Sequence, residues 1–575
     1  MSFESSATKV LLHALRAAFV ARRLEARVLR RELRRAHDET VAANDQERRA
    51  GAAKRPAGAR NILFITVDQQ RWNALGCNGG RIARTANLDA LAARGMRYTR
   101  PHVQNVVCMP SRATMFTGQH PRTHGVIANG IALPEEAPNV ARVLRREAGY
   151  RTALIGKAHF EPHLDPFLRF RESSLAAEGS TGPFHDLDHV ELASHGPLGG
   201  HHYAAWLWDE HPEDVAGFGG VLTAAAGGET GAPEVKHNPI ARERYHTDWV
   251  ADRTMAWLRG VDATERFFCW MSFPDPHHPF DPPVSEMKRI PFRDVPLPKT
   301  RNAGEATLRA KPRHWLDWYQ GRYRNPEGGP TAFEPAALTD DQLREMTASI
   351  HVENELVDEA IGRVLQFLEE RGLADNTDVI FTSDHGDLQG DFGLFFKGPY
   401  HVDGLLRVPL IWRPARGAGV APSVVDAPVG LVDLAPTFCE IAGLVPPSWM
   451  EGTPLPTAPD AVRPPVLTTF DSQFAAVGMH LRTMFDGRYL CTAYERSDHE
   501  GGAFPIYWAV WGRGSQIPRY DGTEGELYDC ANDPDQCENL WSDPSRRGLR
   551  DELVADLRTR LPVARFPALP FRAPT

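Results

Sequence analysis

Two short apolar segments, far apart in the sequence, limit the fold more than any other feature of this chain. Ile62–Val67 is rich in β-branched residues and runs directly into Asp68. Val379–Thr382 is a second such run, followed closely by Asp384 and His385. Runs of this length and composition are typical of strands buried on both faces of a parallel sheet. Because open α/β sheets bind ligands at the carboxyl ends of their strands, both segments predict a polar site at that edge.

Helical segments alternate with these predicted strands. They cover residues 87–95, 140–149, 251–260 and 353–372. The alternation predicts an α/β fold whose large, mostly parallel sheet is sandwiched by helices. A proline-rich linker is predicted from Pro446 to Pro465. The hairpin-forming and turn-rich segments after it predict a smaller α+β domain with an antiparallel sheet.

The length of 575 residues exceeds what one hydrophobic core usually supports, so we expect more than one domain. The predicted parts are a basic helical arm over residues 1–56, a large domain over 57–460 and a smaller C-terminal domain over 461–575. Arginines interrupt the apolar positions of the arm, which argues against a signal peptide and against a membrane span. The apolar stripe of the arm fits docking on a partner subunit or an anionic surface, and it equally fits packing on the chain's own body.

Polar residues near the predicted strand ends indicate a metal ion and an anion. Asp68, Gln69, Asp384 and His385 together offer oxygen-rich ligands for a divalent cation, although single strand-end aspartates also cap helices and turns. Further cationic side chains lie in short polar segments, at Arg112, Lys157, His159, His277 and Lys397. Since the net charge of the chain is −9, several cations in such loops predict a local pocket for a compact anion.

The cysteines leave one thiol to be explained. Seven cysteines, an odd number without a framework spacing, favour a reducing compartment, and we expect a cytoplasmic protein. Cys108 lies in the segment CMPSRATMFTG, with Arg112 four residues further on. A buried structural thiol is the commoner role of a single cysteine. The motifs around Cys108 help to decide whether this thiol is structural or functional.

The segments around Cys108 and Lys157 resemble the two signatures of the sulfatase family, within the alkaline phosphatase superfamily. CMPSRATMFTG resembles the first signature, in which CxPSR directs oxidation of the cysteine to formylglycine. GYRTALIGKAH resembles the second, GYxTxxxGKxH. The resemblance runs from about Asn61 to the ELYD segment near the C-terminus. It implies an alkaline phosphatase-like fold, with a sulfatase-like catalytic domain over residues 57–460.

The resemblance also implies a chemistry for Cys108. A formylglycine-generating enzyme would convert the thiol to an aldehyde, which hydrates to a geminal diol. One hydroxyl, bound to the metal, would attack sulfur in line with the leaving alcohol, and the second would let the intermediate collapse with release of sulfate. The expected activity is therefore arylsulfatase-like hydrolysis of small anionic sulfate esters, with promiscuity toward related esters.

The implied metal ligands are Asp68, Gln69, the modified Cys108, Asp384 and His385. Many sulfatases have a second aspartate where this chain has Gln69 and an asparagine where it has His385. Ca²⁺ is the expected ion, but these changes remove a negative charge and add a nitrogen ligand, so the preference for Ca²⁺ is weaker and Mn²⁺ or Mg²⁺ also fits. The same pattern resembles the phosphonate monoester hydrolase branch of the superfamily. Hydrolysis of phosphonate monoesters and phosphodiesters at this site is therefore the first alternative.

The implied catalytic residues are Cys108, Arg112, Lys157, His159, His277 and Lys397. Arg112 would steady the hydrate, and His159 would orient the diol or assist its collapse. Lys157 and Lys397 would neutralise charge developing on the sulfate. Either His277 or Lys397 would protonate the departing oxygen. The residues expected to contact the substrate are Lys157, His277, Lys397 and Asn129, the last through its amide.

The remaining expectations concern partners. A second alternative function is an unmodified, catalytically silent binding or assembly protein in which Cys108 stays a thiol. We expect a dimer or tetramer, and no nucleic-acid partner, because no zinc finger, Gly-rich phosphate loop or basic-aromatic motif is present. The aromatic-rich segments 199–212 and 312–326 are predicted to line the site mouth or a subunit contact, or else to pack in the core. Their tryptophans are Trp206, Trp208, Trp315 and Trp318.

Overall fold

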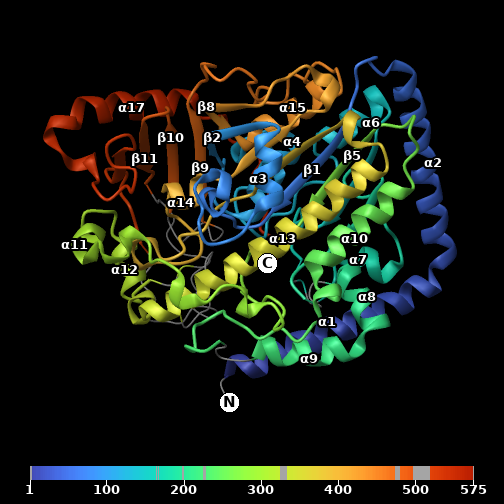
Figure 1. Cartoon of the computed structure of the whole chain (residues 1–575), viewed down its shortest axis with the longest axis horizontal. Helices are drawn as coiled ribbons and strands as arrows, with labels where there is room; N and C mark the ends of the chain where they lie inside the picture. Colours follow the sequence, from blue (N-terminus) through green and yellow to red (C-terminus); the bar gives the residue numbers. More distant parts are fainter. Residues whose placement is uncertain are drawn as a thin grey trace.

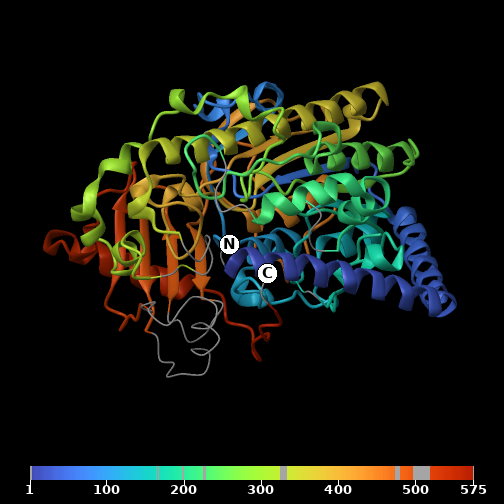
Figure 2. The same cartoon turned by 90° about the horizontal axis from the view of Figure 1, so that it is seen from below.

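Two β-sheets organise the protein, which we describe from a computed structural model. The structure describes residues 3–163, 165, 167–196, 200–223, 228–323, 325, 333–472, 479–496 and 518–573. One sheet has eight strands and the other has four. The smaller sheet, orange to red in Figures 1 and 2, lies at one end of the molecule.

The larger sheet is mostly parallel. Its strands are β1 (Asn61–Val67), β2 (Met96–His102), β3 (Arg151–Gly156), β4 (His189–Leu192), β5 (Phe267–Ser272), β6 (Thr377–Ser383), β7 (Leu410–Arg413) and β8 (Ser423–Gly430). They lie in the order β4-β3-β5-β1-β6-β7-β2-β8, and only the two pairings of β7 are antiparallel. Every residue of β1 and β6 is buried, as the apolar runs predicted, and every residue of β5 is buried too. The predicted α/β class is confirmed.

Helices cover both faces of this sheet (Figure 1). The alternating side chains of β1 separate the two cores, since Phe64 packs in one cluster and Ile65 in the other. The first cluster includes residues of α4 (Cys108–Thr117), α6 (Val140–Ala148) and α15 (Leu434–Ile441). The second includes residues of α3 (Ala86–Ala93), α10 (His246–Arg259) and α13 (Asp340–Glu370). Further helices are α5 (Pro121–His124), α7 (Arg171–Glu178), α8 (His202–Glu210), α9 (Pro212–Thr223), α11 (Gly304–Arg309), α12 (His314–Tyr319) and α14 (Asp403–Leu406).

Helix α13 is longer than its apolar pattern predicted. It begins at Asp340 rather than near residue 353. The side chain of Thr339 accepts a hydrogen bond from the backbone of Gln342, and the Gln342 side chain accepts one from the backbone of Thr339. This reciprocal capping box satisfies two backbone groups that a helix start otherwise leaves unpaired. The N-terminal extension of α13 is therefore set by capping rather than by apolar periodicity.

The smaller sheet is antiparallel, in the order β12-β11-β10-β9. Its strands are β9 (Val466–Asp471), β10 (His480–Phe485), β11 (Tyr489–Tyr494) and β12 (Gly525–Asp529), and α17 (Arg547–Arg560) lies beside it (Figure 1). The predicted hairpin corresponds to β10 and β11. The expected second, antiparallel sheet is confirmed.

Acid should weaken this sheet through Asp471, which ends β9. The Asp471 carboxylate accepts hydrogen bonds from Arg482 Nη2 at 2.8 Å and from His480 Nδ1 at 2.6 Å. Burial raises the pKa of Asp471, but Arg482 and His480 outweigh burial and lower this pKa to about 2. The folded pKa thus lies below the unfolded value of about 3.9, so the carboxylate stabilises the fold above pH 4 and loses this effect as the pH falls toward 2.

We therefore predict that Asp471→Asn lowers the free energy of unfolding by about 2 kcal/mol at pH 7. The difference from wild type should shrink toward zero as the pH approaches 2. Urea unfolding at a series of pH values measures it, with the exposed Asp551→Asn as the matched control. A deficit that stays constant down to pH 2 would show that Asp471 does not act through its charge.

The N-terminal arm consists of α1 (Phe3–Val28) and α2 (Arg30–Lys54), drawn in dark blue in Figures 1 and 2. Helix α1 contacts α7 and α9, and α2 contacts α6. Phe19 is 2% exposed and packs on Leu168, Ala176 and Ala205, with its ring 4.7 Å from that of Trp208. The sequence allowed the arm to dock on a partner subunit, on an anionic surface or on the chain's own body. In this structure it packs on the chain's own body. No helix in the described ranges is both long enough and apolar enough to span a membrane.

Candidate active site

Neighbouring strands of the larger sheet place the predicted polar residues at one edge. Asp68 follows β1, Lys157 follows β3, and Asp384 and His385 follow β6. Strand β5 lies between β3 and β1, and β6 lies on the other side of β1. Cys108 is the first residue of α4. One ligand atom from each of Asp68, Cys108, Asp384 and His385 lies within 4.8 Å of the other three, and all four residues are buried.

Cys108 lies at the centre of this cluster and is 1% exposed. Its Sγ lies 3.0 Å from Lys397 Nζ, 3.2 Å from His385 Nε2 and 3.7 Å from Asp68 Oδ1. Burial and the Asp68 carboxylate raise the pKa of the Cys108 thiol, but Lys397, Lys157 and His385 outweigh them and lower it from its usual value. The thiol therefore lies in a strongly cationic environment, unlike that of a structural cysteine.

The residues around Cys108 fit a divalent metal ion. His385 Nδ1 lies 2.9 Å from the Gly386 carbonyl oxygen and donates its proton there, which leaves Nε2 facing the cluster, where a metal ion would replace a proton. Gln69 Nε2 donates to Asp387, whereas its buried Oε1 has no hydrogen-bond partner among the described residues. An orphaned buried oxygen costs roughly 1–3 kcal/mol unless a ligand satisfies it. The cluster thus presents carboxylate and amide oxygens with one imidazole nitrogen, as a Ca²⁺, Mg²⁺ or Mn²⁺ site requires.

Arg112 and Lys157 hold the two aspartates of the cluster. Arg112 Nε donates to Asp384 Oδ2 at 2.8 Å, and Arg112 Nη1 donates to Ser272 Oγ at 2.8 Å and to the Lys157 carbonyl at 2.7 Å. Arg112 Nη2 makes no hydrogen bond within the described residues and lies 3.6 Å from Asp68 Oδ2. Burial raises the pKa of Asp68, but Lys157, Lys397 and Arg112 hold it well below its usual value. Asp68 is therefore a carboxylate, as a metal ligand would need to be, and one N–H group of Arg112 makes no hydrogen bond within the described residues.

Lys397 and His277 form a hydrogen-bonded pair beside the thiol. Lys397 Nζ lies 2.7 Å from His277 Nε2, and His277 Nδ1 lies 2.6 Å from the His278 carbonyl oxygen. The Nδ1 proton is thus donated to that carbonyl, and Nε2 accepts from the ammonium. Burial and the Lys397 charge lower the pKa of His277 well below its usual value, whereas Cys108 and Asp68 raise the pKa of Lys397 against the effect of burial. Of the two acids left open by the sequence, Lys397 holds the proton.

His159 occupies a strained backbone conformation that a buried carboxylate supports. Its φ is 57°, in the left-handed region that a non-glycine residue rarely adopts. Glu172, on α7, accepts backbone N–H groups from His159 at 2.7 Å, Phe160 at 2.8 Å and Glu161 at 2.9 Å. Sequence reasoning missed Glu172, because only the folded loop places α7 against these three amides. Glu172 is a positioning residue for His159.

Substituting Glu172 should therefore impair turnover. In Glu172→Gln, either orientation of the amide points its NH₂ group at a backbone N–H. Losing one such bond costs about 1–3 kcal/mol, so kcat should fall about tenfold to a hundredfold if the loss is felt in the transition state. Steady-state kinetics with an aryl sulfate, together with the melting temperature, measure this. Glu178→Gln on the same helix is the control, and equal losses in the two variants would exclude a specific role for Glu172.

Asn129 and the tryptophans of the two aromatic-rich segments lie in different parts of the fold. Asn129 Oδ1 accepts a hydrogen bond from Met109 N at 3.0 Å, so this amide oxygen supports the first turn of α4. Trp315 and Trp318 are 0% and 2% exposed and belong to the core, so of the placements predicted for them the core is observed. Trp206 and Trp208 lie on α8, and Trp208 contacts the arm.

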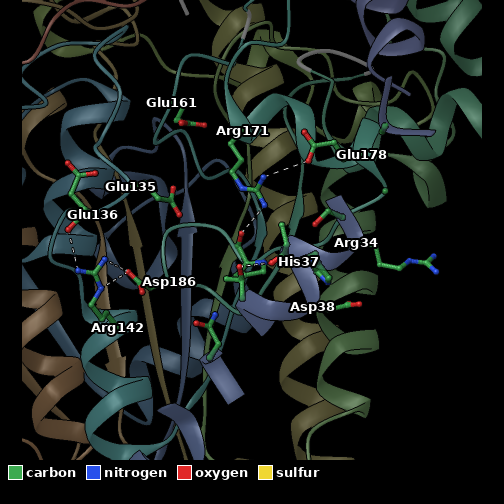
Figure 3. Close-up of a pocket in the computed structure, with 17 residues that line it drawn as sticks. Arg34, His37, Asp38, Glu135, Glu136, Arg142, Glu161, Arg171, Glu178 and Asp186 are labelled. Atoms are coloured by element: carbon green, nitrogen blue, oxygen red, sulfur yellow. Dashed lines mark hydrogen bonds and ion pairs between the residues drawn. The ribbon is translucent and has the colours of Figure 1, made fainter. Parts of the chain in front are cut away.

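A cavity of about 1200 Å³ lies between the arm and the body, away from this cluster. Figure 3 shows Arg34, His37 and Asp38 of the arm on one side of it. On the other side, Arg171 faces Glu178 at 3.7 Å, and Arg142 pairs with Asp186 at 2.7 Å. Two ion pairs thus lie on the second side, and no predicted site residue lines this cavity.

Comparison with known proteins decides the family. A model of the sulfatase family matches residues 60–444. The chain belongs to the sulfatase family. Sulfatases are sulfuric ester hydrolases, so the resemblance inferred from the two signatures is confirmed, and the matched range contains every predicted site residue.

Relatives of this sulfatase extend the comparison. It is 29% identical over 496 residues to the uncharacterized sulfatase YidJ of Escherichia coli (strain K12), covering 85% of this chain and 84% of that protein. It is 28% identical to an arylsulfatase of Clostridium perfringens, over 69% of this chain and 77% of that protein. The phosphonate monoester hydrolase of Agrobacterium radiobacter superposes with a TM-score of 0.67 at 25% identity, covering 87% of this chain and 96% of that chain. The likeness to both groups matches the two functions that the sequence left open.

Proposed function

We propose that this sulfatase is a metal-dependent hydrolase of aryl and related sulfate esters, and that a formylglycine hydrate derived from Cys108 is its nucleophile. One observation carries the proposal. The Cys108 Sγ lies among a cationic lysine, an imidazole and a carboxylate, at 3.0, 3.2 and 3.7 Å respectively. An aldehyde hydrate at this position would have its two hydroxyls among these same side chains, Lys397, His385 and Asp68.

Asp68, Gln69, Asp384 and His385 would hold the metal ion, with the modified Cys108 completing the set. The bound ion supplies a lowered pKa for the attacking hydroxyl. Ca²⁺ is the proposed ion, and the Gln69 oxygen and His385 nitrogen also suit Mn²⁺ or Mg²⁺. Arg112 holds Asp384 in place, and its Nη2, which makes no hydrogen bond within the described residues, would be available to steady the hydrate.

The cations of the site would bind the ester anion. Arg112, Lys157 and Lys397 outnumber the Asp68 and Asp384 carboxylates, so the cluster is positive before any metal binds. Lys157 and Lys397 would bind the sulfate oxygens, where each well-placed donor contributes about 3 kcal/mol to transition-state stabilisation. Lys397 would then pass a proton to the departing alcohol. His277 accepts a hydrogen bond from Lys397 and would orient its ammonium.

A phosphonate monoester hydrolase is the second candidate, supported by the superposition with the Agrobacterium enzyme and by the Gln69 and His385 ligands. Both candidates predict monoanionic esters as substrates. The test compares kcat/KM for 4-nitrophenyl sulfate and for the 4-nitrophenyl monoester of phenylphosphonate, on one sample of modified, metal-loaded enzyme. We expect the sulfate ester to be preferred. A reversed ratio would support the second candidate, and hydrolysis of neither ester would contradict both.

A further inference from the structure

A second cluster of ligand-type side chains lies beside the proposed active site. His195, His246 and Asp275 are buried, and each offers one ligand atom within 4.8 Å of the others. His195 follows β4, His246 begins α10, and Asp275 follows β5, so three separate elements converge. The Asp275 carbonyl accepts a hydrogen bond from Asp68 N at 3.0 Å, so this cluster adjoins the first one.

The two histidines of this cluster lack the hydrogen bonds expected of buried imidazoles. His195 is 8% exposed, and neither of its ring nitrogens has a hydrogen-bond partner among the described residues. His195 Nδ1 lies 3.9 Å from Asp275 Oδ1. His246 Nε2 lies 2.6 Å from the same oxygen, while His246 Nδ1 has no partner within the described part of the chain. Buried polar groups in native proteins are normally satisfied, and imidazole nitrogen is the commonest metal ligand.

The surroundings of Asp275 also lack a positive charge. Asp281 and Glu353 are fully buried nearby, and Asp281 Oδ1 and Glu353 Oε2 have no hydrogen-bond partner in the described residues. No lysine or arginine of the described ranges lies within ion-pair distance of Asp275, Asp281 or Glu353, and within those ranges only His195 and His246 form ion pairs with Asp275. The other groups that donate to the Asp275 carboxylate are the neutral hydroxyls of Tyr245 and Thr247. Burial and the Asp275 and Asp281 carboxylates raise the pKa of Glu353 well above its usual value. Buried carboxylates are normally paired with cations or coordinate metals.

We propose that His195, His246 and Asp275 bind a second divalent ion of the zinc class, separate from the ion at Asp68 and Asp384. Two imidazoles and one carboxylate suit Zn²⁺, Co²⁺, Fe²⁺ or Mn²⁺ better than Ca²⁺. Binding would displace the proton that His246 Nε2 shares with Asp275, and that proton passes to solvent. Asp275 Oδ1 lies 2.6 Å from His246 Nε2 and 3.9 Å from His195 Nδ1. The distance between two ligand atoms of one tetrahedral ion falls between these two values.

The ion would anchor the loop that carries His277. The His195 and His277 rings lie 5.4 Å apart, and Asp275 is two residues before His277. Joining Asp275 to the end of β4 and to the start of α10 would fix this loop against the larger sheet. The second ion thus positions the partner of Lys397 and does not contact the substrate.

The test counts metal ions without relying on activity. Chelator-treated protein is loaded with Zn²⁺ alone and, separately, with Co²⁺ alone, and bound metal is measured by mass spectrometry of the elements. We expect His195→Ala to lose one equivalent of Zn²⁺ per chain, together with the visible Co²⁺ absorption of a nitrogen-rich site. Asp384→Asn should lose the other equivalent and keep that absorption.

His201→Ala is the matched control. His201 is 2% exposed, and both of its ring nitrogens also lack partners among the described residues, but it lies outside the cluster. This variant should retain both equivalents of Zn²⁺. If His195→Ala does not fold, as judged by circular dichroism, His195→Gln replaces it. An unchanged Zn²⁺ content and Co²⁺ spectrum in the folded His195 variant would overturn the proposal, as would the same loss in His201→Ala.

Discussion

Replacing Cys108 with alanine should lower kcat/KM for 4-nitrophenyl sulfate by about 10⁴-fold or more, as losses of catalytic nucleophiles do. The reason is structural as well as chemical. Lys397, His385 and Asp68 surround the Sγ position, so the substitution removes the group on which the charged side chains of the site converge. Initial rates of the metal-loaded wild type and variant measure the loss. The wild-type concentration is corrected for the fraction of chains in which Cys108 is modified.

The control for this variant is Cys269→Ala. Cys269 is another buried cysteine, in β5, and it packs in the apolar core. Its substitution should lower the melting temperature and leave kcat unchanged. Residual activity in Cys108→Ala above about a hundredth of wild type would mean that another group attacks the ester.

Lys397→Ala should slow the hydrolysis of poor leaving groups far more than that of good ones. Because Lys397 is the protonated member of its pair with His277, its loss leaves the departing alkoxide without an acid. General acid catalysis contributes about 10²–10⁴-fold, so an alkyl or sugar sulfate should lose that factor while 4-nitrophenyl sulfate loses much less. The dependence of log kcat/KM on leaving-group pKa is the measurement, and its slope should steepen.

His277→Ala separates the two possible acids. It removes the acceptor but keeps the Lys397 ammonium, so the rate should fall with little change in the slope. If His277→Ala steepens the slope and Lys397→Ala does not, the assignment of the proton to Lys397 is wrong.

The strand ends were predictable because their signal is local. An apolar β-branched run followed by an aspartate identifies both the buried strand and the residue at its carboxyl end, as at Asp68 and Asp384. Arg112 and Lys157 lie within motifs that resemble family signatures. Their placement beside the two aspartates depends on the order of β3, β5, β1 and β6, which the sequence does not display.

Other features depend on tertiary contacts and leave no local pattern. Glu172 holds the His159 loop only because α7 packs against it, and its sequence context is that of an ordinary helix start. The apolar stripe of the arm fitted three kinds of surface, and only the placement of Phe19 against α7 and α8 distinguishes packing on the body. His195 and Asp275 meet because β4 and β5 end at the same edge of the sheet.

The most direct test of the account is the mass of the peptide that contains Cys108. The measurement uses protein from the native host, or protein co-expressed with a formylglycine-generating enzyme. We expect the thiol to be replaced by an aldehyde or its hydrate, and turnover in different preparations to rise in proportion to the modified fraction. An intact thiol in a preparation that hydrolyses sulfate esters would contradict it.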